Sequence, residues 1–140
     1  MCGFTRRSVF AVAAGGLAAW SLRAEADSLQ HREFIAAAFK MKDEAIRAGD
    51  QPYGAVVVRD RRIIGFGPSR VVLKNDWTAH AEREAMREAS ARLGTGDLGG
   101  CVLYSTSRPC GDCERAAAHA NIARMYHGMD VIDAGKPRRS

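Results

Sequence analysis

The sequence predicts an α/β fold of three layers (α/β/α), in which one mixed β-sheet lies between helices. Three observations predict it. Short runs of β-branched residues alternate with longer segments whose apolar residues recur at helical spacing. These segments follow one another in the order αββαβαβ. Histidine, glutamate and cysteine residues occur where two of the helices should begin.

The first half of the domain reads as a helix followed by two paired strands. Apolar residues at helical spacing predict a helix over residues 28–48, and Gly49 ends the pattern. Residues 55–58 form a β-branched strand, and residues 60–62 turn the chain into a second strand over residues 63–66.

The second half alternates helices and strands. A helix is predicted from His80 to about Leu93, and a third strand over residues 102–106. A helix over residues 110–120 and a strand over residues 122–126 follow, and residues 130–133 can add a short edge strand. We expect the sheet to be short at this C-terminal end.

The strongest functional signal is a His-x-Glu motif followed by a Pro-Cys-x-x-Cys motif. One imidazole (His80) and two thiolates (Cys110 and Cys113) form a donor set suited to Zn²⁺ and leave a fourth position for water. Zinc lowers the pKa of that water, so that zinc-bound hydroxide can attack an amino-bearing ring carbon. Glu82 is the predicted catalytic proton shuttle. The pattern is typical of zinc-dependent deaminases.

The cysteine spacing suits a helix start. Cys110 and Cys113 lie at i, i+3 on one helical face, and Pro109 is favourable at the first turn, where thiolates are stabilised. A redox disulfide is the alternative for this pair, and we favour zinc because of the upstream His-x-Glu. Cys101 lies in an apolar run and is expected in the core.

His80 and Glu82 are two residues apart and would diverge around a helix. Both side chains can reach the same site if they lie in the first turn of a helix whose end faces that site, with Asp76 or Thr78 as the helix cap.

The N-terminal segment is typical of an export signal. Arg6 and Arg7 form a twin-arginine motif, residues 9–20 are weakly apolar, and residues 24–26 read Ala-Glu-Ala, a cleavage pattern. We therefore expect a signal peptide over residues 1–26, a domain over residues 27–140 and a periplasmic location without a stable membrane anchor. A cytoplasmic extension, a mis-assigned start and an uncleaved anchor are the alternatives.

Charge indicates a small-molecule partner and no nucleic acid. The 140-residue chain has a net charge of +5, but from Asp27 onward 18 Lys and Arg stand against 15 Asp and Glu. The excess lies in a basic tail over residues 134–140, which is expected to be solvated and disordered. The remainder shows no basic stripe that would suggest a phosphate-backbone partner.

Three segments, residues 52–56, 75–82 and 109–113, resemble the cytidine deaminase-like superfamily. Within it they are most similar to the branch of bacterial guanine deaminases and tRNA adenosine deaminases, and the resemblance covers most of residues 34–128. It implies a three-layer α/β/α fold, commonly a homodimer. It also implies zinc ligands at His80, Cys110 and Cys113, and a proton shuttle at Glu82.

The resemblance also implies substrate-binding positions. The backbone N–H groups of Ala81 and Cys110 would polarise the substrate. Gly54 and Ala55 would form part of the pocket floor. Ser69 occupies the place where this branch has an asparagine that binds the base, and a serine is shorter.

Three departures from the branch concern the pocket. Trp77 replaces a proline, Arg108 replaces a glutamate, and little sequence follows Gly128 to form the usual last strand and helix. We expect an open site or one completed by a partner subunit.

The expected function is hydrolytic deamination of a nucleobase or nucleoside, with an amino-purine such as guanine favoured. A cytosine or cytidine deaminase and a non-catalytic zinc-stabilised domain are the alternatives. RNA editing is disfavoured by the expected export and by the nearly neutral domain.

Overall fold

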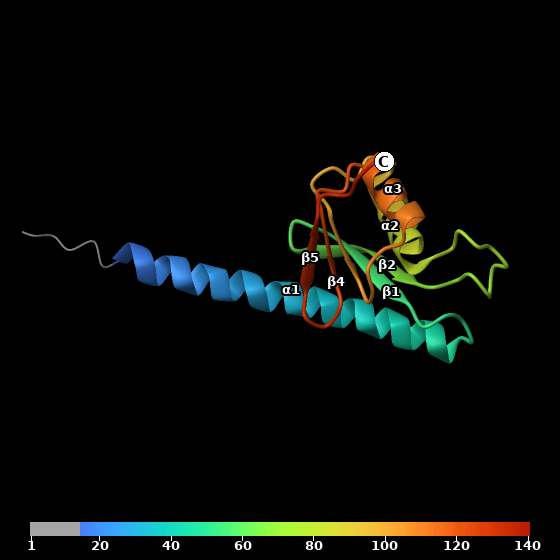
Figure 1. The fold of residues 1–140 in the computed structure, drawn as a ribbon, viewed down its shortest axis with the longest axis horizontal. Helices are drawn as coiled ribbons and strands as arrows, with labels where there is room; N and C mark the ends of the chain where they lie inside the picture. Colours follow the sequence, from blue (N-terminus) through green and yellow to red (C-terminus); the bar gives the residue numbers. More distant parts are fainter. Residues whose placement is uncertain (1–14) are drawn as a thin grey trace, which may run out of the picture.

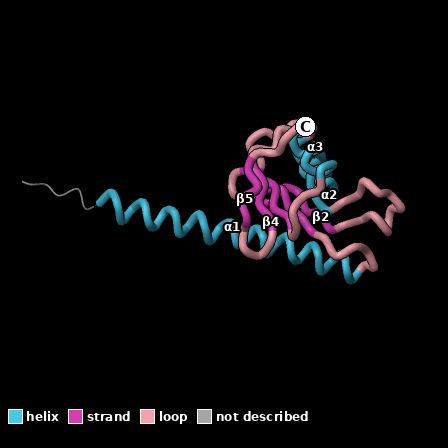
Figure 2. Tube along the Cα trace, in the orientation of Figure 1, coloured by secondary structure: helices cyan, strands magenta, loops and turns pink. Residues whose placement is uncertain are grey.

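The computed structural model describes residues 15–140. A five-stranded sheet lies between α1 (Gly15–Arg47) on one face and the pair α2 (Ala81–Leu93) and α3 (Gly111–His119) on the other (Figures 1 and 2). This arrangement confirms the predicted three-layer fold.

The sheet has the strand order β2-β1-β3-β4-β5. β1 (Gly54–Arg59) pairs antiparallel with β2 (Arg62–Pro68) and with β3 (Val102–Ser105). β3 pairs in parallel with β4 (Arg124–His127), and β5 (Ile132–Gly135) adds an antiparallel edge. The sheet is therefore mixed, as predicted, and it has a fifth strand that begins two residues later than the sequence suggested.

Strand β1 has a hydrophobic core on each side. Ala55 and Val57 pack on the side of α2 and α3, whereas Val56 and Val58 pack on the side of α1. This alternation follows from the two-residue period of a strand. Cys101 is fully buried in the first of these cores, which confirms its predicted structural role.

Helix α1 begins at Gly15, well before the predicted start at Ser28. No proline or glycine interrupts residues 17–48, so nothing in this segment stops a helix. Residues 16–29 are exposed, and the helix buries side chains against the sheet from Phe34 and Ile35 onward. Figure 1 shows the N-terminal part of α1 projecting from the domain.

The predicted cleavage boundary after Ala26 falls inside this projecting part of α1, and the twin-arginine motif lies outside the described residues. Within residues 15–140, no helix combines the length and the apolar character needed to cross a membrane.

Close contact between β2 and α2 positions the start of that helix. A Cβ atom at Gly67 would lie 2.0 Å from the carbonyl oxygen of Ala81, the first residue of α2. Only glycine fits at this distance, so the residue type at Gly67 sets how near β2 and α2 can approach.

The C-terminal residues lie against α3. Pro137 is buried. The backbone N–H and the Nε of Arg138 both donate to Glu114 Oε1, at 3.1 Å each. An acidic side chain near the start of α3 thus holds the basic segment that was expected to be disordered.

Candidate metal centre and active site

A tight loop before α2 fixes the position of His80. The Arg70 N–H donates to the Ala79 carbonyl oxygen at 3.0 Å. The Asp76 carboxylate accepts hydrogen bonds from the N–H and the Oγ1 of Thr78, at 2.8 and 2.7 Å. His80 itself takes the N-cap position and makes no capping hydrogen bond with its side chain. The prediction that Asp76 or Thr78 caps the helix is therefore wrong, and the imidazole is left available for another partner.

The start of α3 places both predicted cysteines. Cys110 is the N-cap residue, and its Sγ accepts a hydrogen bond from the Cys113 N–H at 3.4 Å. Sulfur atoms in the first turn lie near the positive end of the helix dipole, which offsets part of the cost of burying a thiolate. The predicted helix start after Pro109 is confirmed.

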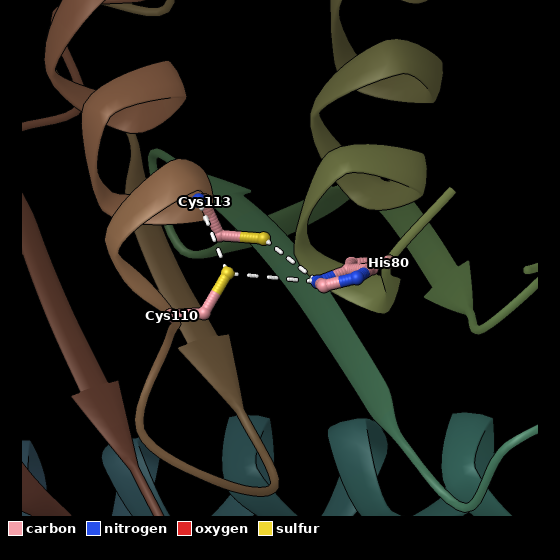
Figure 3. A group of neighbouring side chains, drawn as sticks. All are labelled: His80, Cys110 and Cys113. Atoms are coloured by element: carbon pink, nitrogen blue, oxygen red, sulfur yellow. Dashed lines mark hydrogen bonds between the residues drawn. The ribbon is translucent and has the colours of Figure 1, made fainter. Parts of the chain in front are cut away.

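The two helix starts bring His80, Cys110 and Cys113 together, with their side chains directed toward one another (Figure 3). Nδ1 of His80 lies 3.6 Å from Cys110 Sγ and 3.4 Å from Cys113 Sγ. A tetrahedral zinc site, with Zn–S of about 2.3 Å and Zn–N of about 2.0 Å, requires N···S separations of about 3.5 Å. The residues present therefore fit zinc both in chemistry and in spacing.

Glu82 lies in the first turn of α2, two residues after His80, and is 6% exposed. Burial raises the pKa of this carboxyl group, although its own backbone N–H and the neighbouring Cys113 thiol act in the opposite direction. The first turn thus places an imidazole and a carboxyl group at one point, as the sequence predicted. A buried carboxyl group beside the three donor atoms is well placed to exchange protons.

Metal binding and proton release are linked at Cys113. Burial raises the pKa of the Cys113 thiol, and the nearby Glu82 charge raises it further. A bound divalent cation reverses this preference, because a coordinating thiol is deprotonated. Zinc affinity should therefore fall as the pH is lowered.

Two of the three donor residues, His80 and Cys110, open onto a cavity of about 290 Å³. This volume lies near the lower end of the roughly 300–1,000 Å³ found for small-molecule sites, which suits a single ring system. The residues that line it are Gln51, Tyr53, Ser69, His80, Ala81, Glu82, Ser107, Arg108 and Cys110.

Two of the four predicted substrate-binding positions line this cavity, Ser69 and Ala81. Gly54 does not, because it packs against α1, where an added Cβ would lie 2.1 Å from the Ala38 carbonyl oxygen. Ala55 does not either, because its side chain is buried in the core below α2. These two residues support the cavity wall from behind and do not form its floor.

Asp50 organises the wall of the cavity, and sequence reasoning missed it. Its Oδ1 accepts from the Gln51 N–H at 2.7 Å and from the Ser69 hydroxyl at 2.9 Å, and its Oδ2 accepts from the Leu73 N–H at 2.9 Å. Burial acts to raise the pKa of Asp50, but these hydrogen bonds outweigh burial and lower it. The signal in the sequence that could have identified Asp50 is its position directly after Gly49, the glycine that ends the predicted helix.

Gln51, Tyr53, Ser107 and Arg108 also line the cavity without having been predicted as site residues. The pairing of β1 with β3 brings them there, since the Thr106 N–H donates to the Gly54 carbonyl oxygen at 3.0 Å. Their sequence signals were their places within or next to the motifs at residues 52–56 and 109–113, and the departure already noted at Arg108.

Comparisons with known proteins agree with this geometry. Residues 28–129 match the family model described as the cytidine and deoxycytidylate deaminase zinc-binding region. The chain is 36% identical over 109 residues to a guanine deaminase of Bacillus subtilis (strain 168), covering 77% of this chain and 70% of that protein. It is 43% identical over 95 residues to a tRNA-specific adenosine deaminase of Agrobacterium fabrum, covering 66% of this chain and 62% of that protein.

A solved structure shares the fold as well. The X-ray structure of guanine deaminase from Bacillus subtilis superposes with a TM-score of 0.68 at 37% identity, covering 70% of this chain and 63% of that one. The matched region spans 70% of the Bacillus subtilis sequence, and somewhat less than two thirds of the Agrobacterium fabrum protein and of the solved chain.

Proposed function

The chain belongs to the cytidine and deoxycytidylate deaminase zinc-binding family, whose members include zinc-dependent deaminases, and we propose that it deaminates a nucleobase or nucleoside, with an amino-purine such as guanine favoured. The observation that carries the proposal is the buried Glu82 beside a cluster of three donor residues, two of which line the same cavity as Glu82. Structural zinc sites normally have four protein ligands. A three-ligand set with an adjacent carboxyl group is suited to catalysis.

Each residue has a distinct part in the proposed reaction. His80, Cys110 and Cys113 would hold zinc, which when bound acts as a Lewis acid and makes water a stronger acid. Glu82 takes a proton from the attacking water and delivers protons to the ring nitrogen and to the leaving amino group. Water adds to the amino-bearing carbon, the C–N bond breaks, and ammonia departs. The backbone N–H groups of Ala81 and Cys110 are the proposed donors to the substrate.

Recognition of the ring edge is assigned to Gln51 as well as to Ser69. The Ser69 hydroxyl already donates its hydrogen to Asp50, so toward a ligand it can only accept. The Gln51 side-chain amide makes no hydrogen bond within residues 15–140 and lines the same cavity. Its donor and acceptor groups suit the paired polar atoms at the edge of a base.

A free base or nucleoside is favoured over RNA. The similarity to a tRNA-specific adenosine deaminase makes tRNA the second candidate. The near balance of charge from Asp27 onward argues against a surface that tracks a phosphate backbone. Retention of tRNA at physiological salt would reverse this choice. A cytosine or cytidine substrate is the other alternative within the same chemistry.

Export and dimerisation complete the proposal. The order of twin-arginine motif, apolar run and Ala-Glu-Ala supports removal of residues 1–26 and a periplasmic location. The proposed dimer rests on the resemblance of residues 34–128 to a commonly dimeric family.

Ammonia release by the zinc-quantified protein against guanine, adenine, cytosine and their nucleosides tests the function. One substrate should be turned over, and Glu82→Ala should reduce its rate by about 10²- to 10⁴-fold while zinc content and thermal stability stay unchanged. Glu33→Ala, which removes an exposed carboxylate on α1, is the matched control. Loss of zinc in Glu82→Ala would contradict the proton-shuttle role. Full zinc occupancy without turnover of any compound would favour a non-catalytic zinc domain.

A further inference from the structure

Arg108 is a charged residue on the cavity wall to which the proposed reaction assigns no part. It lines the cavity together with Ser107, Gln51 and Tyr53, and it lies two residues before the donor Cys110. Arg108 is exposed and lies at the entrance of the cavity, whereas Glu82 is buried beside the donor atoms.

The backbone that carries Arg108 is held on both sides. The Ser105 hydroxyl donates to the Ser107 carbonyl oxygen at 2.5 Å, which fixes the turn that leaves β3. On the other side, Pro109 is buried and Cys110 caps α3. The guanidinium group is therefore presented from a fixed point of the wall.

The nearby acidic side chains are already engaged. Asp112 pairs with Arg115, and Glu114 pairs with Arg138 at 3.1 Å. Asp50 accepts three hydrogen bonds from the loop it organises. Within residues 15–140, Arg108 forms neither a hydrogen bond nor an ion pair, so its planar set of five N–H donors is available.

The charge of Arg108 acts over the surrounding surface. Burial, and after it the Arg108 charge, lowers the pKa of His127 at the end of β4. The pKa of Glu114 is lowered mainly by its hydrogen bond with Arg138 and, to a smaller extent, by the Arg108 charge, so that this charge acts on both the end of the sheet and the start of α3.

Resting on the deaminase function above, we propose that Arg108 binds an anionic substituent of the substrate, a phosphate monoester or a carboxylate. The preferred substrate is then an anionic derivative of an amino-bearing base. A guanidinium fork pairs with two oxygens of such a group, and these charge-assisted contacts are stronger than neutral ones. The ring occupies the cavity of about 290 Å³, and the anion lies at its entrance.

Binding can be measured apart from turnover in the zinc-loaded Glu82→Ala protein. Titration calorimetry would compare guanosine 5′-monophosphate with guanosine, cytidine 5′-monophosphate with cytidine, and 5-carboxycytosine with cytosine. In at least one pair the anionic member should bind about 10- to 100-fold more tightly. The first two pairs report a phosphate, and the third reports a carboxylate.

Adding Arg108→Gln should abolish this difference within the responding pair. Arg115→Gln is the matched control, because it removes the same charge from α3 but lies outside the cavity lining. It should leave the difference intact. Equal binding of anionic and neutral members, no binding of any compound, or an unchanged preference in Arg108→Gln would each overturn the proposal.

The outcomes also separate this inference from the proposed function. Turnover of a neutral base with no anionic preference would refute the role of Arg108 and leave the deaminase function standing. Anion binding that depends on Arg108, without ammonia release from any compound by the unmutated protein, would refute the nucleobase deaminase function instead.

Discussion

The hydrogen bonds that a polar side chain near the cavity already makes determine what it can still do. Within residues 15–140, no buried side-chain nitrogen or oxygen lacks a partner. The Ser69 hydroxyl donates its hydrogen to Asp50, so it stabilises the cavity wall and can only accept a hydrogen bond from a ligand. The carboxyl group of Glu82 has the Cys113 thiol beside it, at the proposed reaction centre.

Asp50→Asn should destabilise the protein by about 1–3 kcal/mol, because an amide N–H₂ would face one of three existing donors. The native pKa of Asp50 is lowered relative to about 3.9 in an unfolded chain. Its stabilisation is therefore present above about pH 4 and is lost as the pH falls through the lower native pKa. Urea unfolding of the zinc-depleted proteins should show the difference at pH 7 and a smaller one near pH 3.

Asp60→Asn is the control, because this carboxylate has a side chain that is 94% exposed. It should change the free energy of unfolding by less than about 0.5 kcal/mol. An equal effect of the two substitutions, or a difference for Asp50→Asn that persists at low pH, would contradict the assigned role.

At the scale of elements, the site forms where the N-terminal ends of α2 and α3 lie close together. The N-cap and first turn of α2 supply an imidazole and a carboxyl group, and the N-cap and first turn of α3 supply two thiols. The distance between these turns depends on how α2 and α3 lie on the sheet, and β2 approaches α2 through Gly67.

Gly67→Ala should lower the free energy of unfolding by at least about 1–3 kcal/mol, because its Cβ would overlap the Ala81 carbonyl oxygen. The start of α2 must shift to relieve the overlap, so zinc affinity should fall as well. Thermal unfolding and competition with a chelator measure the two effects.

Gly96→Ala is the matched control, because a Cβ atom at this loop glycine would have no other heavy atom within 4 Å. It should leave zinc affinity unchanged and alter stability by less than about 1 kcal/mol. If Gly67→Ala behaved like Gly96→Ala, β2 would not fix the start of α2.

At the scale of the whole molecule, α1 has two parts with different surroundings. Residues 16–29 are exposed, whereas Phe34, Ile35 and Ala38 are buried against the domain. The domain is therefore held by the C-terminal part of the helix, and residues 16–26 of the proposed signal segment lie outside its core.

A protein of residues 27–140 should unfold within about 2 °C of a protein of residues 16–140, because residues 16–26 contribute no buried side chain. Protein exported by the twin-arginine route should have the mass of this shorter chain. A chain starting at residue 36 should unfold at a much lower temperature, since it lacks Phe34 and Ile35, each worth about 2–5 kcal/mol. Marked instability of residues 27–140 would show that the exposed segment supports the fold.

The sequence by itself determined the order of the elements, the mixed sheet and the residues of the metal site. These follow from local periodicity and from motifs such as Pro109–Cys113, whose spacing is read within one helical turn. The sequence also indicated that Cys101 is structural, because it lies in an apolar strand.

Only the tertiary structure decided which residues line the cavity. Gln51 and Arg108 are far apart along the chain, yet they line the same cavity. They do so because β1 and β3 pair antiparallel, which places the start of β1 beside the end of β3. The same pairing turns Gly54 and Ala55 away from the cavity, toward α1 and the core. A cavity wall is assembled from segments that contact one another only after the sheet has formed, so local pattern cannot specify it.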